Sequence, residues 1–585
     1  MARRTSFGNT WWGRAWVDAL EGIDYNTNRL PRGRRYARNG SVREIRISDG
    51  IVYARVKGTR PSPYRVEISL KHFRPSVVKK IKNILAEAPS VVTAVSMGQL
   101  PEDVNSLLES EGINLFPEDW DEIRASCSCP DWANPCKHLA AVYYIIASEI
   151  DKDPFLLFNL RGIKTEEITS LAGLSTAPPS RKSDEILSVF SLPHEVDNPM
   201  PLISGELPDI TPGKLEVDAL LKLLPEKPSF YPHGNFRKRL LSIYQGIEKG
   251  IATTEILEDT PSMADWSPYI RFERGEHTAF IIADTFRNEW IPASKARAKL
   301  PIPDRGKVRF RTTPSWRVRM TDLLRYLMRL PSESLEGNLT EGMWFLLAAV
   351  VTARVLLNQG LFVPEVLFHD GNAFSIRYSP LVYDEKVERL LDCLRSAMPC
   401  YVFHTGRGRI IRRDGFPEVI SLILTTMVHL LFENSPRTDD PMMEIFTTGR
   451  TYEVSSFEEE RTGKAIADYL EGLQIRNRTI LPLIRIDSSG RRNFSLSVDI
   501  QRRDDPLSES LPISSIFDDS KREILSIPAK QARTETLRNI TTLSNFIPEL
   551  KRVVDSRGRK SVRITPRRMA EILTDARQML DILGV

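Results

Sequence analysis

The sequence predicts a multidomain α+β protein, in which a small antiparallel sheet with helices precedes a mixed α/β region. A chain of 585 residues is too long for one hydrophobic core, and its length suggests roughly three to four domains. Apolar residues make up 41% and charged residues 27%, the balance of a folded globular protein. Apolar and polar residues alternate near the N-terminus, as in β-strands, and from about residue 260 helix and strand patterns are mixed. These two patterns predict the α+β fold class.

The N-terminal part begins with three short, β-branched segments in which apolar and polar residues roughly alternate. Asp49-Gly50 between the first two is a type I′ hairpin signal, so we expect an antiparallel meander. Apolar residues then recur at helical spacing, and a short strand, DEIRAS, lies between two further helical segments. The predicted strands are 41–48, 50–58 and 64–70, and the predicted helices are 77–85, 100–112 and 138–150.

The rest of the chain mixes helices and strands. Proline-rich, irregular stretches at 171–184 and 193–212 are typical of linkers. Thr565 as N-cap and Pro566 at the first helical position predict a final helix that reaches Leu580. We also expect helices at 236–249, 320–330, 341–357, 384–397 and 416–433, and a hairpin at 480–500 that turns at Ser489-Gly490.

Nothing in the sequence indicates a membrane segment. The two longest apolar stretches, 343–357 and 419–432, are interrupted by Arg354 and His429 and are shorter than the ~20 residues that a bilayer span needs. The N-terminus carries charge but no apolar signal region, so we expect a cytoplasmic location. Five cysteines are too few for a disulfide framework in this chain, and clustered cysteines in a reducing compartment more often bind metal.

Positive charge is concentrated near the N-terminus. The whole chain has a net charge of +5, whereas the segment from Arg29 to Arg65 has eleven basic and two acidic residues, a net charge of +9. Such a local field favours a polyanion such as nucleic acid. The arginines around Gly33 and Tyr36 either grip phosphates or form a solvated face. The candidate nucleic-acid-binding residues are Arg32, Arg34, Arg35, Arg38, Arg46, Arg60 and Lys137.

The stretch CSCPDWANPCKH, residues 127–138, gathers three of the five cysteines and one histidine. Cys127 and Cys129 are two residues apart, and Cys136 and His138 repeat that spacing after six intervening residues. This arrangement suits a closed tetrahedral Cys₃His site for one structural zinc ion, without an open position for a catalytic water. Buried thiols with a satisfied histidine, or a redox pair, are the alternatives. A redox centre more typically shows a C-x-x-C motif.

The spacing C-x-C-x₆-C-x-H, followed by an apolar helix, resembles the SWIM zinc finger. The resemblance extends through FGNTWWGRAWVDALE, RLPRGRRYARNGSV, GTRPSPYRVEI and CSCPDWANPCKHLAAVYY, and it covers about residues 5 to 250. Similar prokaryotic proteins are encoded with or near SWI/SNF-type helicases. The resemblance implies that Cys127, Cys129, Cys136 and His138 hold the zinc, and that the module contacts DNA or proteins.

More weakly, residues 260–585 resemble the accessory region that precedes the motor in prokaryotic SWI/SNF-type helicases, through WSPYIRF, VDIQRRDDPL and RITPRRMAEILTDARQMLDILGV. ERTGKA lacks the leading glycine and the Ser or Thr of a phosphate-binding P-loop, so we expect no ATPase activity from this chain. We expect four parts, namely a basic α+β domain at 1–110, a SWIM zinc finger at 111–165, a linker with closing helices at 166–250, and a helicase-associated region at 260–585.

These observations predict a non-catalytic, zinc-containing accessory subunit that binds nucleic acid, with DNA favoured and RNA left open. The resemblance implies that it acts with a separately encoded SWI/SNF-type ATPase and without a membrane. The alternative is an adaptor whose zinc module binds partner proteins instead of DNA. A cryptic nuclease or ATPase is a third reading, but no metal-holding carboxylate run accompanies the scattered acidic residues.

Overall fold

The computed structural model describes residues 7–580 except 9, 24–28, 132–133, 175–189, 192–211, 227, 229, 232–233, 259–261, 273–276, 285, 287, 305–306, 370–372, 383, 436–439, 454–456, 474–478, 489–492, 504, 506–508 and 577–579. Its contacts divide the chain into two compact units. Unit 1 consists of Met1–Pro179, Leu221–Arg237 and Val454–Val585, and unit 2 consists of Ser180–Leu220 and Lys238–Glu453.

This division differs from the expected single region at 260–585, because residues 454–585 pack with the N-terminal residues. The Ser90 backbone N–H donates a hydrogen bond of 3.1 Å to the Asp555 carboxylate. Arg557 donates one of 3.3 Å to the Ala86 carbonyl oxygen. Local periodicity carries no information about contacts over more than 400 residues, so this arrangement could not be predicted from the sequence.

Unit 1 contains the expected meander, a four-stranded sheet that we call sheet A, in the order β1 (Val42–Ser48), β2 (Ile51–Val56), β3 (Tyr64–Leu70) and β4 (Ile123–Cys127). Asp49 and Gly50 have φ of 51° and 74°, as the predicted type I′ turn requires. Alternate residues of β3 are buried, so sheet A has one inner and one outer face.

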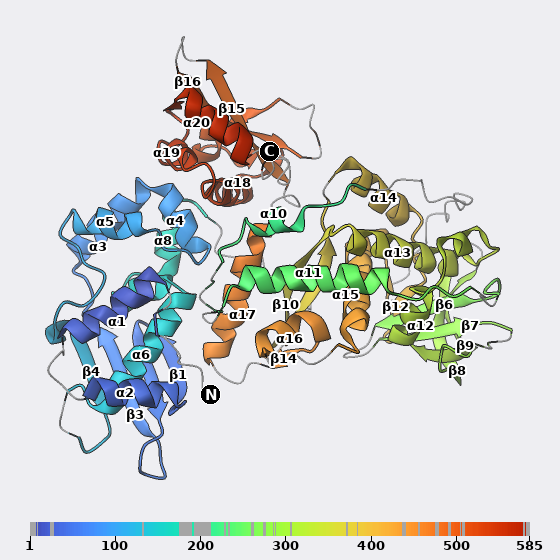
Figure 1. Cartoon of the computed structure of the whole chain (residues 1–585), viewed down its shortest axis with the longest axis horizontal. Coiled ribbons are helices and arrows are strands. Elements are labelled where there is room, and N and C mark those ends of the chain that lie inside the picture. The colour runs from blue at the N-terminus through green and yellow to red at the C-terminus, as the bar shows by residue number, and fades with distance from the viewer. Residues whose placement is uncertain are drawn as a thin grey trace. The chain divides into compact units, whose positions relative to one another are not determined.

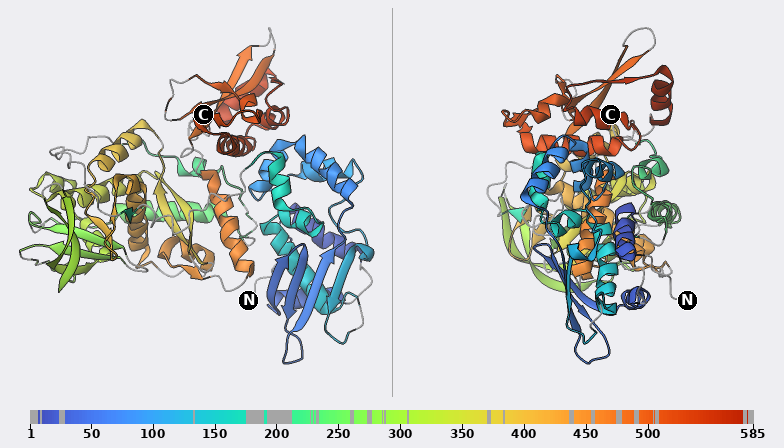
Figure 2. Two further views of the ribbon diagram at one scale, coloured as in Figure 1. Left: turned by 180° about the vertical axis from the view of Figure 1, so that it is seen from behind. Right: turned by 90° about the vertical axis from the view of Figure 1, so that its left-hand side faces the viewer.

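Helices cover the inner face of sheet A. In Figure 1 they lie in front of the blue strands, and in the reverse view of Figure 2 the strands come to the front. Trp16 is fully buried and stacks on Tyr143 with ring centroids 4.4 Å apart, and the Trp12 indole N–H donates to the Ile150 carbonyl. These tryptophans therefore belong to the core. The helices of this part are α1 (Trp11–Ile23), α2 (Arg29–Arg38), α3 (Pro75–Ala86), α4 (Pro89–Ser96), α5 (Glu102–Glu109), α6 (Lys137–Lys152), α7 (Phe155–Leu160) and α8 (Thr165–Leu171).

The C-terminal part of unit 1 is built on the predicted hairpin, now β15 (Ile480–Ser488) and β16 (Phe494–Arg502). Its turn at Ser489-Gly490 lies outside the described residues. The β16 strand also pairs with β17 (Leu511–Pro512) and with β20 (Val562–Ile564). The remaining elements are α17 (Phe457–Leu470), β18 (Glu523–Ile524), β19 (Ile527–Pro528), α18 (Ala529–Leu543), α19 (Glu549–Asp555) and α20 (Pro566–Glu571).

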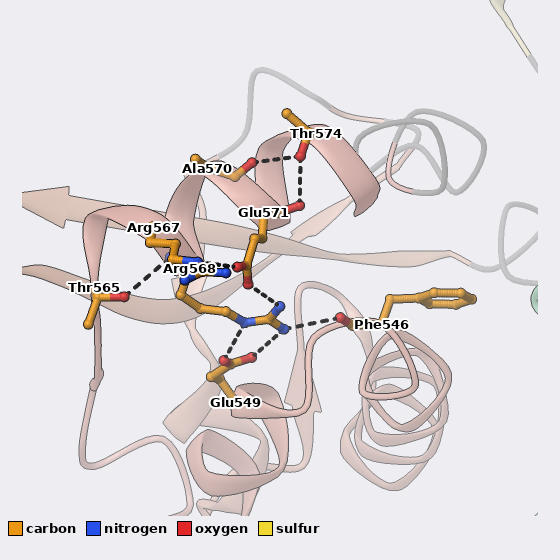
Figure 3. A network of polar contacts seen from close by, with 8 residues as sticks. All are labelled: Phe546, Glu549, Thr565, Arg567, Arg568, Ala570, Glu571 and Thr574. Atoms are coloured by element: carbon orange, nitrogen blue, oxygen red, sulfur yellow. Dashed lines mark hydrogen bonds and ion pairs between the residues drawn. The ribbon is translucent and has the colours of Figure 1, made fainter.

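The final helix starts as predicted, because the Thr565 hydroxyl accepts a hydrogen bond from the Arg568 N–H. The Arg568 guanidinium binds the Glu549 carboxylate, with its Nε 2.7 Å from Oε1, and also pairs with Glu571 (Figure 3). Lys551 pairs with Asp103 at 3.6 Å. Part of this basic C-terminal segment therefore pairs with carboxylates of unit 1. Arg577 and the two residues after it lie outside the described residues.

Unit 2 contains a seven-stranded sheet, which we call sheet C, in the order β5-β13-β12-β6-β7-β9-β8. The β12 strand pairs in parallel with β6, and β8 and β9 form a long antiparallel hairpin at one edge. A smaller sheet runs in the order β10-β11-β14. The strands are β5 (Phe190–Ser191), β6 (Ser267–Phe272), β7 (Thr278–Ile282), β8 (Ser294–Asp304), β9 (Lys307–Arg319), β10 (Phe362–His369), β11 (Ala373–Pro380), β12 (Phe403–Thr405), β13 (Ile410–Ile411) and β14 (Tyr452–Glu453).

The helices of unit 2 are α10 (Val217–Leu221), α11 (Phe236–Ala252), α12 (Met320–Leu327), α13 (Glu341–Asn358), α14 (Glu385–Ser396), α15 (Phe416–Phe432) and α16 (Pro441–Thr448). Five of these helices match the predicted ones, whereas α10 and α16 were not predicted. Two helical stretches, Glu341–Asn358 and Arg413–Phe432, are long and apolar enough to cross a membrane, but 78% and 50% of the most apolar 18 residues in each are buried inside the protein. Such burial is typical of core helices.

The predicted α+β fold class is confirmed. The predicted linkers at 175–184 and 193–211 lie outside the described residues.

Candidate zinc centre and nucleic-acid interface

The four predicted metal ligands come from the end of one strand and the start of one helix. Cys127 is the last residue of β4, and Cys129 follows in the next turn. Cys136 is the N-cap of α6, where its sulfur accepts a hydrogen bond of 3.5 Å from the Leu139 N–H. His138 lies in the first turn of α6. The ligands therefore fix the edge strand of sheet A to the helix that covers its inner face.

The geometry of this cluster suits one structural zinc ion. All four ligand atoms lie within 4.8 Å of one another. His138 Nδ1 is 3.9 Å from Cys127 Sγ and 4.0 Å from Cys136 Sγ. Zinc bonds of about 2.0–2.3 Å in a tetrahedron separate the ligand atoms by roughly 3.5–3.8 Å, so only small shifts are needed. Soft sulfur donors with one imidazole nitrogen, at four closed positions, are the ligand chemistry of structural zinc.

The thiols also have the electrostatics of metal ligands. A hydrogen bond from Cys127, together with bonds to His138 and the Leu139 N–H, lowers the pKa of Cys136 to about 4. The same bond to Cys136, together with burial, raises the pKa of Cys127. One thiolate is therefore favoured before any metal arrives, and the thiolate is the form of cysteine that ligates zinc.

Aromatic rings enclose the histidine ligand. His138 is 3% exposed, with the Tyr64 ring 4.6 Å and the Tyr36 ring 5.5 Å from its own ring centroid. The Lys137 ammonium lies 5.1 Å from the Tyr36 ring centre, and the Arg60 guanidinium lies 5.8 Å from that of Tyr64. Two of the predicted nucleic-acid-binding residues thus rest on the rings that pack around the zinc ligand.

The arginine-rich segment forms helix α2, although its sequence pattern does not predict a helix. Pro31 and Gly33 disfavour a helix when propensity alone is considered. Packing overrides this preference, because a Cβ on Gly33 would lie 2.4 Å from the Ala140 Cβ of α6. Glycine therefore lets the two helices approach closely, while Leu30 and Ala37 are buried beside it. Arg32, Arg35 and Arg38 are exposed on the remaining surface of α2.

Two of the predicted residues are placed differently from the others. The Arg34 guanidinium pairs with Glu21 and lies 5.1 Å from the centre of the Tyr144 ring, so it joins α1, α2 and α6. Arg46 follows the buried Ile45 on β1 and therefore projects from the outer face of sheet A. The structure brings Arg32, Arg35, Arg38, Arg60 and Lys137 to the side of sheet A that carries α2 and the zinc centre, and it leaves Arg46 on the opposite side.

The role of Arg29 in this site was not predicted from the sequence. Its guanidinium pairs at 3.1 Å with Asp131, which lies in the loop between Cys129 and Cys136. The sequence does not show that a basic residue at the start of one segment pairs with an acidic residue inside the metal loop.

Among the residues that the structure describes, one group contains three or more clustered metal ligands, namely Cys127, Cys129, Cys136 and His138. Cys393 and Cys400 are outside this group.

Comparisons with known proteins agree with the geometry of the centre. The family of the SWIM zinc finger matches residues 110–147, and a domain of unknown function, DUF8276, matches residues 215–456, most of unit 2. The chain is similar to "Uncharacterized protein Rv2102" of Mycobacterium tuberculosis (strain ATCC 25618 / H37Rv), with 39% identity over 174 residues. That match covers 30% of this chain and 62% of the relative. No solved structure matches the chain. Residues 110–147 are therefore a SWIM zinc finger domain, whose four ligands fit one structural zinc ion.

Proposed function

We propose that this protein is a non-catalytic nucleic-acid-binding accessory subunit whose zinc finger holds a basic helix for contact with DNA. The observation that carries the proposal is the exposure of Arg32, Arg35 and Arg38 on α2, a helix fixed against the zinc-bearing helix α6. Arginine guanidinium groups bind phosphate oxygens in a bidentate way, and contacts of this kind position a protein on the DNA backbone.

The zinc centre supports this surface in three places. Arg29 at the start of α2 pairs with Asp131 of the metal loop. Tyr36 of α2 packs edge to face on the ligand His138. Lys137, next to that ligand, lies over the Tyr36 ring. We therefore expect the metal to set the position of the arginines without contacting DNA itself.

Binding of the full-length chain to a short mixed-sequence DNA duplex, measured over a series of salt concentrations, tests the proposal. The variant changes Arg32, Arg35 and Arg38 to Ala. Each phosphate contact contributes about 0.9 to the slope of log K against log salt, so loss of three contacts lowers the slope by up to roughly 2.7. The matched control changes Arg55, Arg65 and Arg124 to Ala, three exposed arginines on the outer face of sheet A.

Equal effects of the two triple variants would mean that the α2 arginines contribute only net charge. Absence of DNA binding at low salt, with the fold intact, would favour the adaptor function, in which the zinc finger contacts proteins. An RNA duplex of the same sequence distinguishes the two nucleic acids, because an A-form helix presents different groove geometry and a 2′-hydroxyl.

We also propose that the partner is a separately encoded SWI/SNF-type ATPase and that the chain itself catalyses no reaction. This part rests on the resemblance of WSPYIRF, VDIQRRDDPL and the C-terminal segment to the accessory region of such helicases. Protein ligands fill all four zinc positions, which leaves no position for a catalytic water. Co-purification of the ATPase from the native host supports the partnership, and ATP hydrolysis by the purified chain contradicts the non-catalytic assignment. The expected location is the cytoplasm.

A further inference from the structure

A second concentration of positive charge lies in unit 2, on the β8–β9 hairpin. Residues 294–319 contain nine basic residues and one acidic residue, a net charge of +8, close to that of the N-terminal basic segment. The described basic residues are all exposed. The hairpin occupies the edge of sheet C and lies at the border of unit 2 in Figure 1.

The hairpin is a folded element with an apolar inner side. Ala298 and Leu300 pack with Tyr269 and Phe280 in a small hydrophobic cluster. The β8 residues on either side of Ala298 therefore project to solvent, since side chains alternate along a strand. Those residues are Arg297 and Lys299.

Several of these cations have no carboxylate partner. Arg311 pairs with Asp304, and Arg319 pairs with Asp322. Among the residues that the structure describes, none makes an ion pair with Arg297, Lys299, Arg309 or Arg317. Uncompensated like charges on one hairpin repel one another, which costs stability unless a polyanion binds them.

The turn between β12 and β13 adds further cations from another part of the chain. Arg407 and Arg409 of this turn are exposed, as are Arg412 and Arg413 directly after β13, and these four too have no ion-pair partner among the described residues. Thr405 pairs in register with Phe272 at the end of β6, so this turn lies at the same end of sheet C as Arg271.

Arg271 places the turn beside the hairpin. Its guanidinium donates a hydrogen bond of 3.3 Å to the Lys299 carbonyl oxygen and lies 4.4 Å from the centre of the Phe280 ring. Its Cδ is 4.0 Å from the position that a Cβ on Gly406 would occupy. The partly buried Arg271 side chain therefore lies close both to the Lys299 backbone carbonyl and to the glycine next to Arg407, although more than 100 residues separate these two in sequence.

We propose that Arg297 and Lys299 of the β8–β9 hairpin, with Arg407 and Arg409 of the β12–β13 turn, form a second nucleic-acid-binding surface that contacts the phosphate backbone of duplex DNA. Residues two apart in a strand are about 6.6–6.8 Å apart, a spacing that spans about two base-pair rises along one DNA strand. The exposed residues opposite them in the hairpin are Thr312 and Pro314, which offer no large apolar anchor. Protein interfaces are usually centred on such anchors, so DNA is the partner that this surface fits.

The second surface extends the proposed function, because both surfaces take the same polyanion, but it can be tested separately. The variant changes Arg297, Lys299, Arg407 and Arg409 to Ala in the full-length chain. We expect weaker binding to the DNA duplex and a salt slope lower by up to roughly 3.6. The matched control changes Arg239, Arg389, Arg395 and Arg450 to Ala, four exposed arginines of unit 2 that lie outside sheet C.

A quadruple variant that binds like its control overturns this inference. If the α2 triple variant then still weakens binding, the proposed function stands without the second surface. If the quadruple variant weakens binding and the α2 triple variant does not, the inference stands and the zinc-side interface fails. Thermal melting of each variant shows whether it is folded.

A second measurement needs no variant. Lysine acetylation of the wild-type chain, with and without the DNA duplex, is read by mass spectrometry. We expect DNA to protect Lys299 but not Lys249, an exposed lysine of α11. Equal modification of Lys299 in the two samples, at a DNA concentration that saturates binding, overturns the inference.

Discussion

Arg29 pairs with Asp131 at 3.1 Å, and this contact joins the start of the arginine-rich helix α2 to the loop between the zinc ligands. The ion pair is only partly exposed, with side-chain exposures of 31% and 21%. Because the metal fixes both ends of this loop, the position of α2 depends on the zinc centre. The basic surface and the metal are therefore coupled, although zinc has no direct role in binding phosphates.

The first prediction is that the purified protein contains one zinc ion per chain and that Cys136→Ala removes it. Zinc contributes about 10–16 kcal/mol in zinc finger peptides, so its loss should unfold the end of β4 and the start of α6. Metal analysis measures the stoichiometry, and hydrogen exchange of residues 120–160 measures the opening. Cys393→Ala, a cysteine outside the ligand group, is the control and should leave both unchanged. A metal-free protein with this region still protected from exchange would contradict the prediction.

The second prediction separates two neighbouring arginines of α2. Arg34 pairs with Glu21 and packs over Tyr144, whereas Arg35 is exposed. We expect Arg34→Ala to lower the free energy of unfolding by about 1 kcal/mol, because a half-exposed ion pair and a cation–π contact are each worth no more than about that. We expect Arg35→Ala to leave stability unchanged and to lower the salt slope of DNA binding by roughly 0.9. Urea denaturation and DNA titrations measure the two effects, and identical behaviour of the variants would refute the distinction.

The sequence predicted the zinc centre because its ligands lie within twelve residues, so their spacing alone specifies the chemistry. It also predicted most helices and strands, since each depends on local periodicity and on end signals such as Thr565. Helix α2 was missed because its stability comes from the close contact of Gly33 with Ala140, more than 100 residues away. No periodicity in RLPRGRRYAR reveals that contact.

A charge count over residues 294–319, which carry a net charge of +8, finds the hairpin part of the basic surface of unit 2, but its link to the turn near residue 407 cannot be found in this way. The cations of this surface are spread over two segments near 297 and 407, and the pairing of β6 with β12 and the contact of Arg271 with Lys299 bring them together. The joining of residues 454–585 to the N-terminal part was missed because contacts such as Ser90 with Asp555 depend on tertiary packing alone. The sequence was most informative where the interacting residues are close together along the chain.

The third prediction concerns the packing of α2 on α6. Gly33→Ala places a methyl group 2.4 Å from the Ala140 Cβ, so the helices must separate. Overpacking of this kind costs about 1–3 kcal/mol of unfolding free energy. Gly22→Ala on α1 is the control, because a Cβ there meets nothing within 4 Å. Ala140→Gly should partly restore the stability of Gly33→Ala. Equal stability of the Gly33 and Gly22 variants would contradict the close packing.

The last prediction concerns pH and the ion pair between Arg568 and Glu549. The hydrogen bond from Arg568 lowers the pKa of the Glu549 carboxyl below its ordinary value. A carboxyl whose pKa is lower in the folded state stabilises the fold above its unfolded-state pKa of about 4.3, and this stabilisation is lost as the pH falls through the folded-state pKa. Arg568 and Glu549 are partly exposed, with side-chain exposures of 31% and 18%, so we expect a contribution of no more than about 1 kcal/mol.

Replacing the Glu549 carboxylate by an amide tests this expectation. Glu549→Gln should lower the free energy of unfolding at pH 7 and have a smaller effect at an acidic pH below the folded-state pKa, where the wild-type carboxyl is itself protonated. Arg567→Ala is the control, because the Arg567 side chain is 91% exposed and pairs only with the neighbouring Glu571 among the described residues. Urea denaturation at both pH values gives the difference. Since Arg568 holds α20 against the start of α19, a loss that is the same at both pH values would show that packing, and not the charge of Glu549, stabilises this contact.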